Sequence, residues 1–159
     1  MAYIVRGLDP KQFSNLFAFD NAQLEARYAT RVVAGPAGRY PCRVSLLNAD
    51  PGDELLLMNH NSHDVRTPYR NNYAIYVRKD AKEAASYVDE LPPVLRSCQI
   101  ALRGYNADGN LIDGVLALDD NVDEIVRTLF ADDSISYIHA HNAAYGCFAA
   151  LVERYGDEA

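Results

Sequence analysis

A chain of 159 residues, 49% of them hydrophobic and 23% charged, can bury a full core and does not have the composition of a disordered protein. Its formal net charge of −7 argues against a nucleic-acid partner, because an acidic surface repels phosphate backbones. Arg6 and Asp9 interrupt the long apolar run that a signal peptide would need near the N-terminus. No apolar run elsewhere approaches membrane-spanning length. We therefore expect a cytoplasmic protein with no membrane partner.

Neither an internal repeat nor a linker divides the chain, so the sequence predicts a single domain over residues 1–159. In the first half, a capping box formed by Asp20 and Gln23 predicts a helix over 21–27. Polar residues predict a long loop over 59–72. Short runs rich in apolar and β-branched residues predict strands over 2–8, 32–34, 54–59 and 73–78.

The middle of the chain is less regular. Residues 81–88 fit one or two helical turns, which Pro92 and Pro93 would end. Beyond them, an Asp-Gly turn between the apolar runs 99–105 and 111–118 predicts a β-hairpin.

The clearest predicted helix begins at Asp120, which we interpret as its cap. The acidic residues at 119–124 suit the first helical turn better than a metal site. An apolar face with helical spacing follows, formed by Val122, Ile125, Val126 and Leu129.

A strand is predicted over 134–141, after this helix. The last segment, 146–155, fits either a helix or a strand returning from a turn at 143–146, and we favour the strand. Four or more sequence-local strands with few helices predict an α+β fold: mainly an antiparallel curved sheet or partial barrel with two or three short helices.

All four histidines occur in two pairs, and the pair at His139 and His141 is the first candidate site. Side chains alternate along a strand, so both imidazoles and Tyr137 should share one face. Across a five-residue loop, Cys147 would stand opposite His141. Imidazole and thiol are the groups most readily tuned near neutral pH, which makes His139, His141 and Cys147 the candidate catalytic residues.

Three interpretations of this group stay open. Cys147 or a water could act as a nucleophile with a histidine as base, or the His-x-His and the thiol could bind zinc or a similar ion. Alternatively, the imidazoles and the thiol are structural, since a free cysteine often packs as a small apolar group. Asn142 strengthens the pocket interpretation and would cap the last segment if that segment were helical.

Arginines supply the second set of candidates. Arg43, Arg70 and Arg103 could hold a carboxylate or phosphate, although an internal ion pair with an acidic residue is the favoured explanation for any one of them. Tyr69, Tyr105 and Tyr137 are placed to line the same site. The histidines of His60-x-x-His63 could bind a metal with Asp64, but they lie in a polar loop and have no partner motif, so we assign no metal ligands.

No Walker loop, dinucleotide fingerprint, His-Glu-x-x-His or Gly-x-Ser-x-Gly motif is present. Nucleotide hydrolysis, NAD chemistry, zincin proteolysis and the α/β-hydrolase fold are therefore disfavoured, and the sequence identifies no cofactor.

Three blocks give the chain a resemblance to a bacterial family known as domain of unknown function 1203, whose members have about this length. The blocks are Pro41-Cys42-Arg43-Val44-Ser45-Leu46, Pro68-Tyr69-Arg70, and His139-Ala140-His141-Asn142-Ala143 with Gly146-Cys147. Where the family pattern continues with a Gly-Pro stretch, this chain has Asn71-Asn72-Tyr73-Ala74. The family has no established activity, but the resemblance implies that the three blocks belong to one pocket.

The leading hypothesis is a pocket for an anionic small molecule. Alternative functions are a metal- or cysteine-dependent hydrolase or transferase, and a protein–protein interaction module whose histidines and cysteine are structural. The sequence leaves the ligand, the oligomeric state and any reaction unassigned. Beside the candidate catalytic residues, the candidate ligand-binding residues are Cys42, Arg43, Tyr69, Arg70, Arg103 and Asn142.

Overall fold

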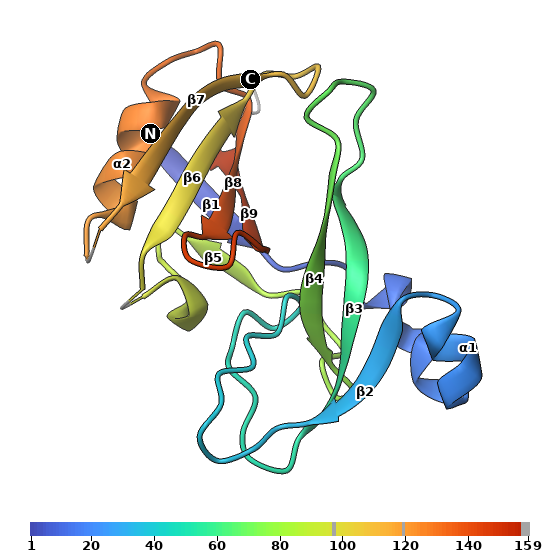
Figure 1. The fold of residues 1–159 in the computed structure, drawn as a ribbon. Coiled ribbons are helices and arrows are strands. Elements are labelled where there is room, and N and C mark those ends of the chain that lie inside the picture. Colours follow the sequence, from blue (N-terminus) through green and yellow to red (C-terminus); the bar gives the residue numbers. More distant parts are fainter. Residues whose placement is uncertain (97, 119, 157–159) are drawn as a thin grey trace.

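A computed structural model describes residues 1–96, 98–118 and 120–156, which form two antiparallel sheets (Figure 1). The larger sheet has six strands in the order β5 (Ser86–Val88), β1 (Ala2–Arg6), β9 (Phe148–Tyr155), β8 (Tyr137–Asn142), β6 (Ile100–Tyr105) and β7 (Leu111–Ala117). The smaller sheet has three strands in the order β2 (Ala29–Val33), β3 (Glu54–His63) and β4 (Asn71–Arg78).

Two α-helices accompany the sheets. Helix α1 (Asn21–Glu25) begins at the predicted capping box: the Asp20 carboxylate accepts from the Gln23 backbone N–H, and the Gln23 side chain accepts from the Asp20 N–H. Helix α2 (Val122–Phe130) is the longer one. Three short 3₁₀ turns occur at Pro10–Gln12, Ser14–Ala18 and Pro93–Leu95.

The predicted start of α2 is wrong by two residues. Its N-cap is Asn121, whose side chain makes no capping hydrogen bond, and Asp120 lies in the preceding turn. Asp119 lies outside the described residues. Asp123, in the first turn, instead accepts the Tyr3 hydroxyl at 2.6 Å and forms an i,i+4 ion pair with Arg127. This pairing holds the helix against the first strand.

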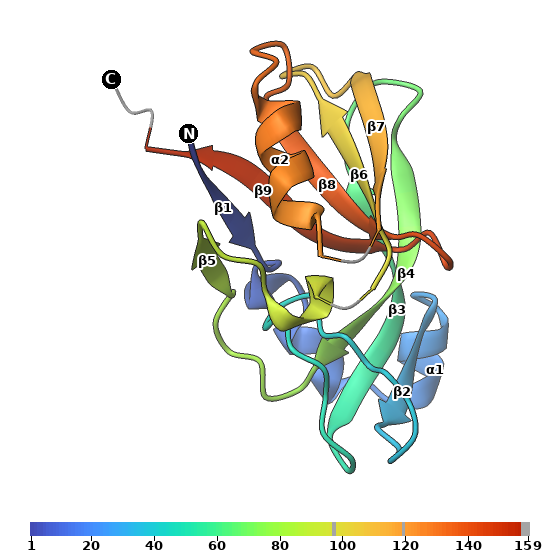
Figure 2. The same cartoon turned by 90° about the vertical axis from the view of Figure 1, so that its left-hand side faces the viewer.

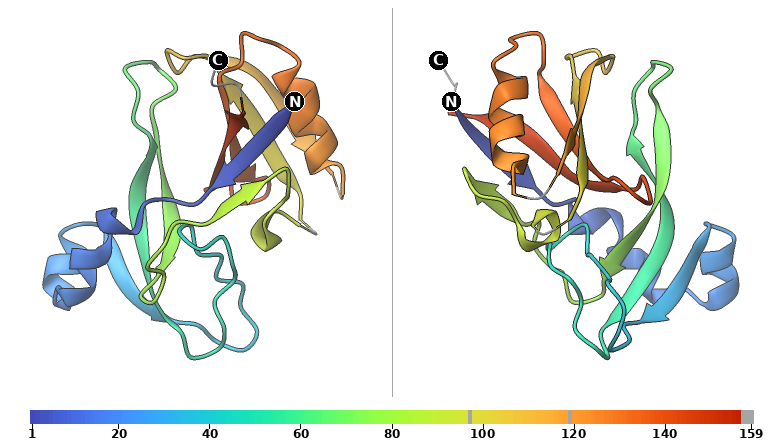
Figure 3. Two further views of the ribbon diagram at one scale, coloured as in Figure 1. Left: turned by 180° about the vertical axis from the view of Figure 1, so that it is seen from behind. Right: turned by 60° about the vertical axis from the view of Figure 1, so that its left-hand side comes forward.

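Helix α2 covers one face of the larger sheet (Figure 2), as its apolar spacing predicts. Val122, Val126 and Leu129 are buried there with the strand residues Leu102 and Ile138. Because side chains alternate along β8, the opposite face of the sheet carries the odd-numbered residues of this strand. That second face is turned toward the hairpin of β3 and β4 (Figure 3).

The mainly antiparallel α+β prediction is confirmed, but the strands do not form one curved sheet or a partial barrel. They divide into two sheets, and the described strands close no barrel. The last segment is the favoured strand, β9, and it pairs with both β8 and β1 (Figure 1). No helix within the described ranges is long and apolar enough to cross a bilayer.

Two local predictions are wrong. Strand β3 continues to His63 and β4 begins at Asn71, so only residues 64–70 form the predicted loop. Polar residues such as Asn61, opposite Asn72, occupy this half-solvated hairpin, which hides its strand character in the sequence. Residues 81–85 are not helical, because the chain instead leads into β5, which pairs with β1.

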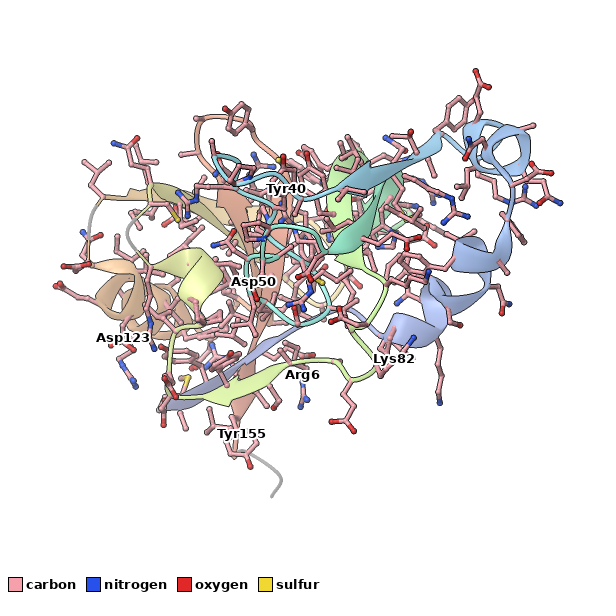
Figure 4. The ribbon with its side chains drawn as sticks, turned by 90° about the horizontal axis from the view of Figure 1, so that it is seen from below. Arg6, Tyr40, Asp50, Lys82, Asp123 and Tyr155 are labelled. Atoms are coloured by element: carbon pink, nitrogen blue, oxygen red, sulfur yellow. The ribbon has the colours of Figure 1, made fainter. Side chains whose placement is uncertain are left out.

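Three segments meet between the sheets at Gly7. The backbone N–H of Gly7 donates to Ala85, that of Leu8 donates to Arg43 at 2.7 Å, and that of Ala85 donates to Val44 at 2.8 Å. The segment that carries Arg43 belongs to the long connection between β2 and β3, on which Tyr40 and Asp50 can be found when the molecule is viewed from below (Figure 4). This junction fixes where Arg43 lies.

We expect Gly7→Ala to destabilise the protein by more than about 2 kcal/mol, because overpacking against backbone cannot be relieved by a side-chain rotation. A methyl group at Gly7 would lie 1.9 Å from the Val44 carbonyl oxygen. Gly114→Ala is the matched control, since its methyl would approach nothing closer than 3.9 Å. Urea unfolding of both variants measures the difference, and equal stability of the two would show that the junction tolerates expansion.

Candidate functional site

A cluster of histidine and tyrosine rings occupies the face of the larger sheet that looks toward the β3–β4 hairpin. Tyr137, His139 and His141 project from β8, and the ring centroids of the two histidines are 6.1 Å apart. The prediction that these three side chains share a face is therefore confirmed. Tyr105 of β6 stacks on Tyr137 with centroids 5.5 Å apart.

His63 joins this cluster from the smaller sheet, and sequence reasoning did not place it there. Its ring centroid lies 4.8 Å from that of His139, its Nε2 is 2.7 Å from the Tyr137 hydroxyl, and its Nδ1 is 3.0 Å from the Tyr69 carbonyl oxygen. A β-bulge between Asn61 and His63 shifts the register of the hairpin at this point. A bulge leaves no clear signature in a polar stretch of sequence.

The neighbouring His60 does not join the cluster. Its ring packs against Phe13 with centroids 5.5 Å apart. Asp64 forms an exposed ion pair with Arg70. Across the described residues, no group of three or more His, Cys, Asp and Glu side chains is arranged to hold a metal ion.

Burial keeps the two histidines of β8 neutral. Loss of solvent, and then the neighbouring His63 and His141, lower the pKa of His139 to about 3. Loss of solvent also lowers the pKa of His141 to about 4, although the hydrogen bond between its Nδ1 and the Gly146 carbonyl opposes the shift. His139 Nδ1 and His141 Nε2 are buried and have no hydrogen-bond partner among the described residues.

Arg103 and Tyr73 connect the ring cluster to the other sheet. Arg103, opposite His139 in the register of β6 and β8, donates from Nη1 to the Tyr73 hydroxyl at 3.0 Å. The Tyr73 ring in turn meets the His141 ring edge to face, with centroids 5.0 Å apart. No carboxylate of the described chain lies within ion-pair distance of Arg103.

Next to this cluster is a cavity of about 700 Å³. Tyr73 belongs to both, because it lines the cavity as well as contacting His141. The other lining residues come from β3, β4, β6 and β9, from the segments that carry Pro41, Val94 and Cys98, and from the end of β8 with the turn that follows it. They are Arg39, Pro41, Arg43, Leu57, Ala74, Tyr76, Val94, Cys98, Ile100, Asn142, Tyr145, Cys147 and Ala149.

Arg43 is the most unusual residue of the cavity wall, because it is a buried cation with an exposed fraction of only 4%. Its Nε donates to the Phe148 carbonyl and its Nη1 to the Pro41 carbonyl, both at 2.5 Å. Burial lowers the pKa of the guanidinium, and the neighbouring thiols of Cys147 and Cys42 oppose that shift. No described carboxylate forms an ion pair with it.

Asn142 and Cys147 organise the turn at the cavity wall. The Asn142 side-chain oxygen accepts from the backbone N–H groups of Ala144 and Tyr145, at 3.1 and 3.0 Å. Its own N–H donates to the Cys147 carbonyl at 2.9 Å. Asn142 is therefore a turn-stabilising residue as well as part of the lining.

The predicted pairing of His141 with Cys147 is wrong. A register shift between β8 and β9 after Ala140 places Phe148 opposite His141. Cys147 lies instead beside the guanidinium of Arg43. The prediction assumed that five residues separate His141 from its partner, whereas His141 and Phe148 enclose six.

The predicted catalytic and ligand-binding residues thus separate into groups. Arg43, Asn142 and Cys147 line the cavity, whereas Arg103, His139, His141 and Tyr69 belong to the adjoining ring cluster. Two others lie elsewhere. Arg70 is exposed in its ion pair with Asp64, and Cys42 is fully buried, with its Sγ accepting from the backbone N–H groups of Ser45 and Arg78.

The depressed pKa values predict that the protein loses stability in acid. Between about pH 4 and 6.5 the unfolded chain protonates His139 and His141 and the folded chain does not, so the free energy of unfolding falls as the pH falls through this window. Each histidine contributes a slope of up to ~1.4 kcal/mol per pH unit. We expect His139→Phe, which keeps an aromatic ring, to reduce the measured slope by the contribution of one histidine, up to ~1.4 kcal/mol per pH unit.

Denaturant unfolding at several pH values measures this slope. Tyr73→Phe is the control, because it removes a hydroxyl from the same cluster and leaves both imidazoles in place. An unchanged slope in His139→Phe would show that His139 is already protonated in the folded protein.

Comparison with known proteins identifies a family but no activity. No curated protein and no solved structure matches the chain. A family model described as "Protein of unknown function (DUF1203)" matches residues 39–154. Every residue that lines the cavity, and the whole ring cluster, falls within this segment. The chain belongs to the DUF1203 family.

Proposed function

We propose that the cavity binds a small molecule with an anionic group and that Arg43 holds this group. The observation that carries the proposal is a guanidinium that is 4% exposed, borders a cavity, and has only neutral partners among the described residues. A buried charge without a counter-charge is costly, and an anionic ligand would supply that counter-charge. Guanidinium groups also bind carboxylates and phosphates through two parallel hydrogen bonds.

The rest of the cavity wall suits an apolar body on the same ligand. Leu57, Val94 and Ile100 contribute aliphatic surface, and two tyrosines contribute rings. A volume of about 700 Å³ is in the range of small-molecule sites. Arg39, exposed at the wall, adds a second positive charge that would attract the anion into an otherwise acidic protein.

The ring cluster borders this cavity and positions one of its lining residues, Tyr73. Tyr73 is held between the Arg103 guanidinium and the His141 ring, so its position on the cavity wall depends on both. The imidazoles are neutral near pH 7, which leaves the arginines as the charged groups of this region. We therefore assign the histidines a positioning role for Tyr73.

Binding is better supported than catalysis by Cys147. A cysteine nucleophile needs a base within hydrogen-bond reach. Among the described residues, neither His139 nor His141 makes a hydrogen bond with Cys147, because the register places Phe148 opposite His141. The thiol contacts the anion-binding guanidinium instead.

We expect the wild-type protein to bind a small branched carboxylate such as 4-methylpentanoate, as measured by calorimetry. Arg43→Gln should weaken this binding at least about tenfold, because it removes a charge-assisted hydrogen bond. Arg70→Gln is the matched control. It removes an exposed guanidinium outside the cavity and should leave the affinity unchanged.

A second measurement avoids any folding defect of Arg43→Gln. In Cys98→Ser, a bulky maleimide should react with Cys147, since Cys42 is fully buried, and should block the cavity and abolish carboxylate binding. Inorganic phosphate is tested in parallel as the other anion that a guanidinium holds. The proposal would be contradicted if the wild-type protein bound neither the carboxylate nor phosphate. It would also be contradicted if binding persisted both in the maleimide-labelled protein and in Arg43→Gln.

A further inference from the structure

Strand β4 forms one edge of the smaller sheet, and that edge is covered only in part. The Pro41–Arg43 segment runs beside it, with Cys42 paired to Tyr76 in a parallel bridge. Two residues earlier on the strand, Ala74 is exposed and lines the cavity. The edge is therefore occupied by protein at Tyr76 and opens into the cavity at Ala74.

The backbone of Ala74 points to this open edge. Tyr76 accepts the Arg43 N–H at 2.9 Å, and the Arg78 N–H points to the Cys42 sulfur at 3.4 Å, so the peptide groups of these two residues face away from β3. Along a strand, every second residue directs its N–H and C=O to the same side. Ala74 therefore directs its own N–H and C=O away from β3 as well.

The partner strand gives independent support. Asn59 stands opposite Ala74 in the β3–β4 ladder, but its N–H donates to Tyr28 at 3.0 Å, on the side of β2. Asn59 and Ala74 thus form a non-hydrogen-bonded pair, in which both residues direct their peptide groups outward. No described residue outside the sheet forms a hydrogen bond with the Ala74 N–H or C=O.

We propose that the cavity takes a peptide-like carboxylate, an N-acylated amino acid or the C-terminus of a short peptide, whose amide pairs with Ala74 while its carboxylate binds Arg43. This inference rests on the proposed function and narrows its ligand class. An extended ligand can add to an open sheet edge through the N–H of its last amide, which would donate to the Ala74 carbonyl. The Arg43 backbone bonds to Tyr76, two residues from Ala74, and Arg43 and Ala74 both line the cavity.

The cavity lining fits the side chain of such a ligand. Leu57, Val94 and Ile100 surround the space with aliphatic groups, which suit an apolar side chain next to the carboxylate. A simple fatty carboxylate would satisfy Arg43 but would leave the peptide groups of Ala74 without a partner. Phosphate would do the same, and this difference separates the ligand classes.

Three ligands with the same apolar side chain test the inference on the wild-type protein. They are N-acetyl-leucine, the acetate ester of the corresponding hydroxy acid, and 4-methylpentanoate. The ester lacks only the amide N–H that would donate to the Ala74 carbonyl. In calorimetry, we expect the dissociation constant of N-acetyl-leucine to be lower than that of either other ligand by a factor of about ten or more.

A backbone variant tests the same contact from the protein side. Ala74→Pro replaces the outward N–H with a ring carbon, which obstructs the close backbone approach that a ligand amide needs to reach the Ala74 carbonyl. It removes no β3–β4 ladder bond, because proline is accepted where an edge strand directs its N–H away from the sheet. It should reduce the preference for N-acetyl-leucine over 4-methylpentanoate. Asn72→Pro changes the same edge outside the cavity lining and should leave the preference intact.

The outcomes separate the two proposals. If 4-methylpentanoate binds in an Arg43-dependent manner and N-acetyl-leucine binds no tighter than its ester, the peptide-like ligand is wrong and the anion site stands. If none of the three ligands binds, both proposals are wrong. A preference for the amide in the wild-type protein that disappears in Ala74→Pro and persists in Asn72→Pro supports the inference.

Discussion

The buried Arg43 is the residue on which both the fold and the site depend. Its backbone N–H bonds to Tyr76 of the smaller sheet, its carbonyl accepts the Leu8 N–H that follows β1, and its side chain donates to Phe148 of the larger sheet. One residue therefore ties together three segments that are distant in sequence. All these partners are neutral, so the contacts that hold the sheets together leave the positive charge of Arg43 uncompensated at the cavity wall.

The surroundings of the cavity preserve this charge imbalance. His139 and His141 would add positive charge if they were protonated, but their burial costs the charged form too much. Arg103 is held by the hydroxyl of Tyr73 and not by a described carboxylate. An acidic protein with a net charge of −7 thus has no Asp or Glu among the described residues that line the cavity, whereas Arg39 and Arg43 both line it.

Local signals in the sequence were enough to predict the elements that are joined by short turns. The Asp-Gly turn predicted the hairpin of β6 and β7, the capping box predicted α1, and alternation placed His139 and His141 on one face. The contacts that build the site are different in kind. They join β4 to the 41–43 segment and His63 to Tyr137, and they depend on two bulges and on long-range pairing that no local pattern encodes. The resemblance between the three blocks and their family therefore indicated a common site, but not which side chains face the cavity.

The pairing of the last hairpin decides which side chains meet His141. A regular ladder after Ala140 would have set Ala149 across from His141. The one-residue shift sets Phe148 there instead. Cys147 falls in the turn, where its thiol lies beside the Arg43 guanidinium and not across from an imidazole, as a nucleophile and its base require. Imidazoles then gather with tyrosines, while the thiol and the cation border the cavity. This separation of the imidazoles from the thiol is what a binding site tolerates and a cysteine-dependent active site does not.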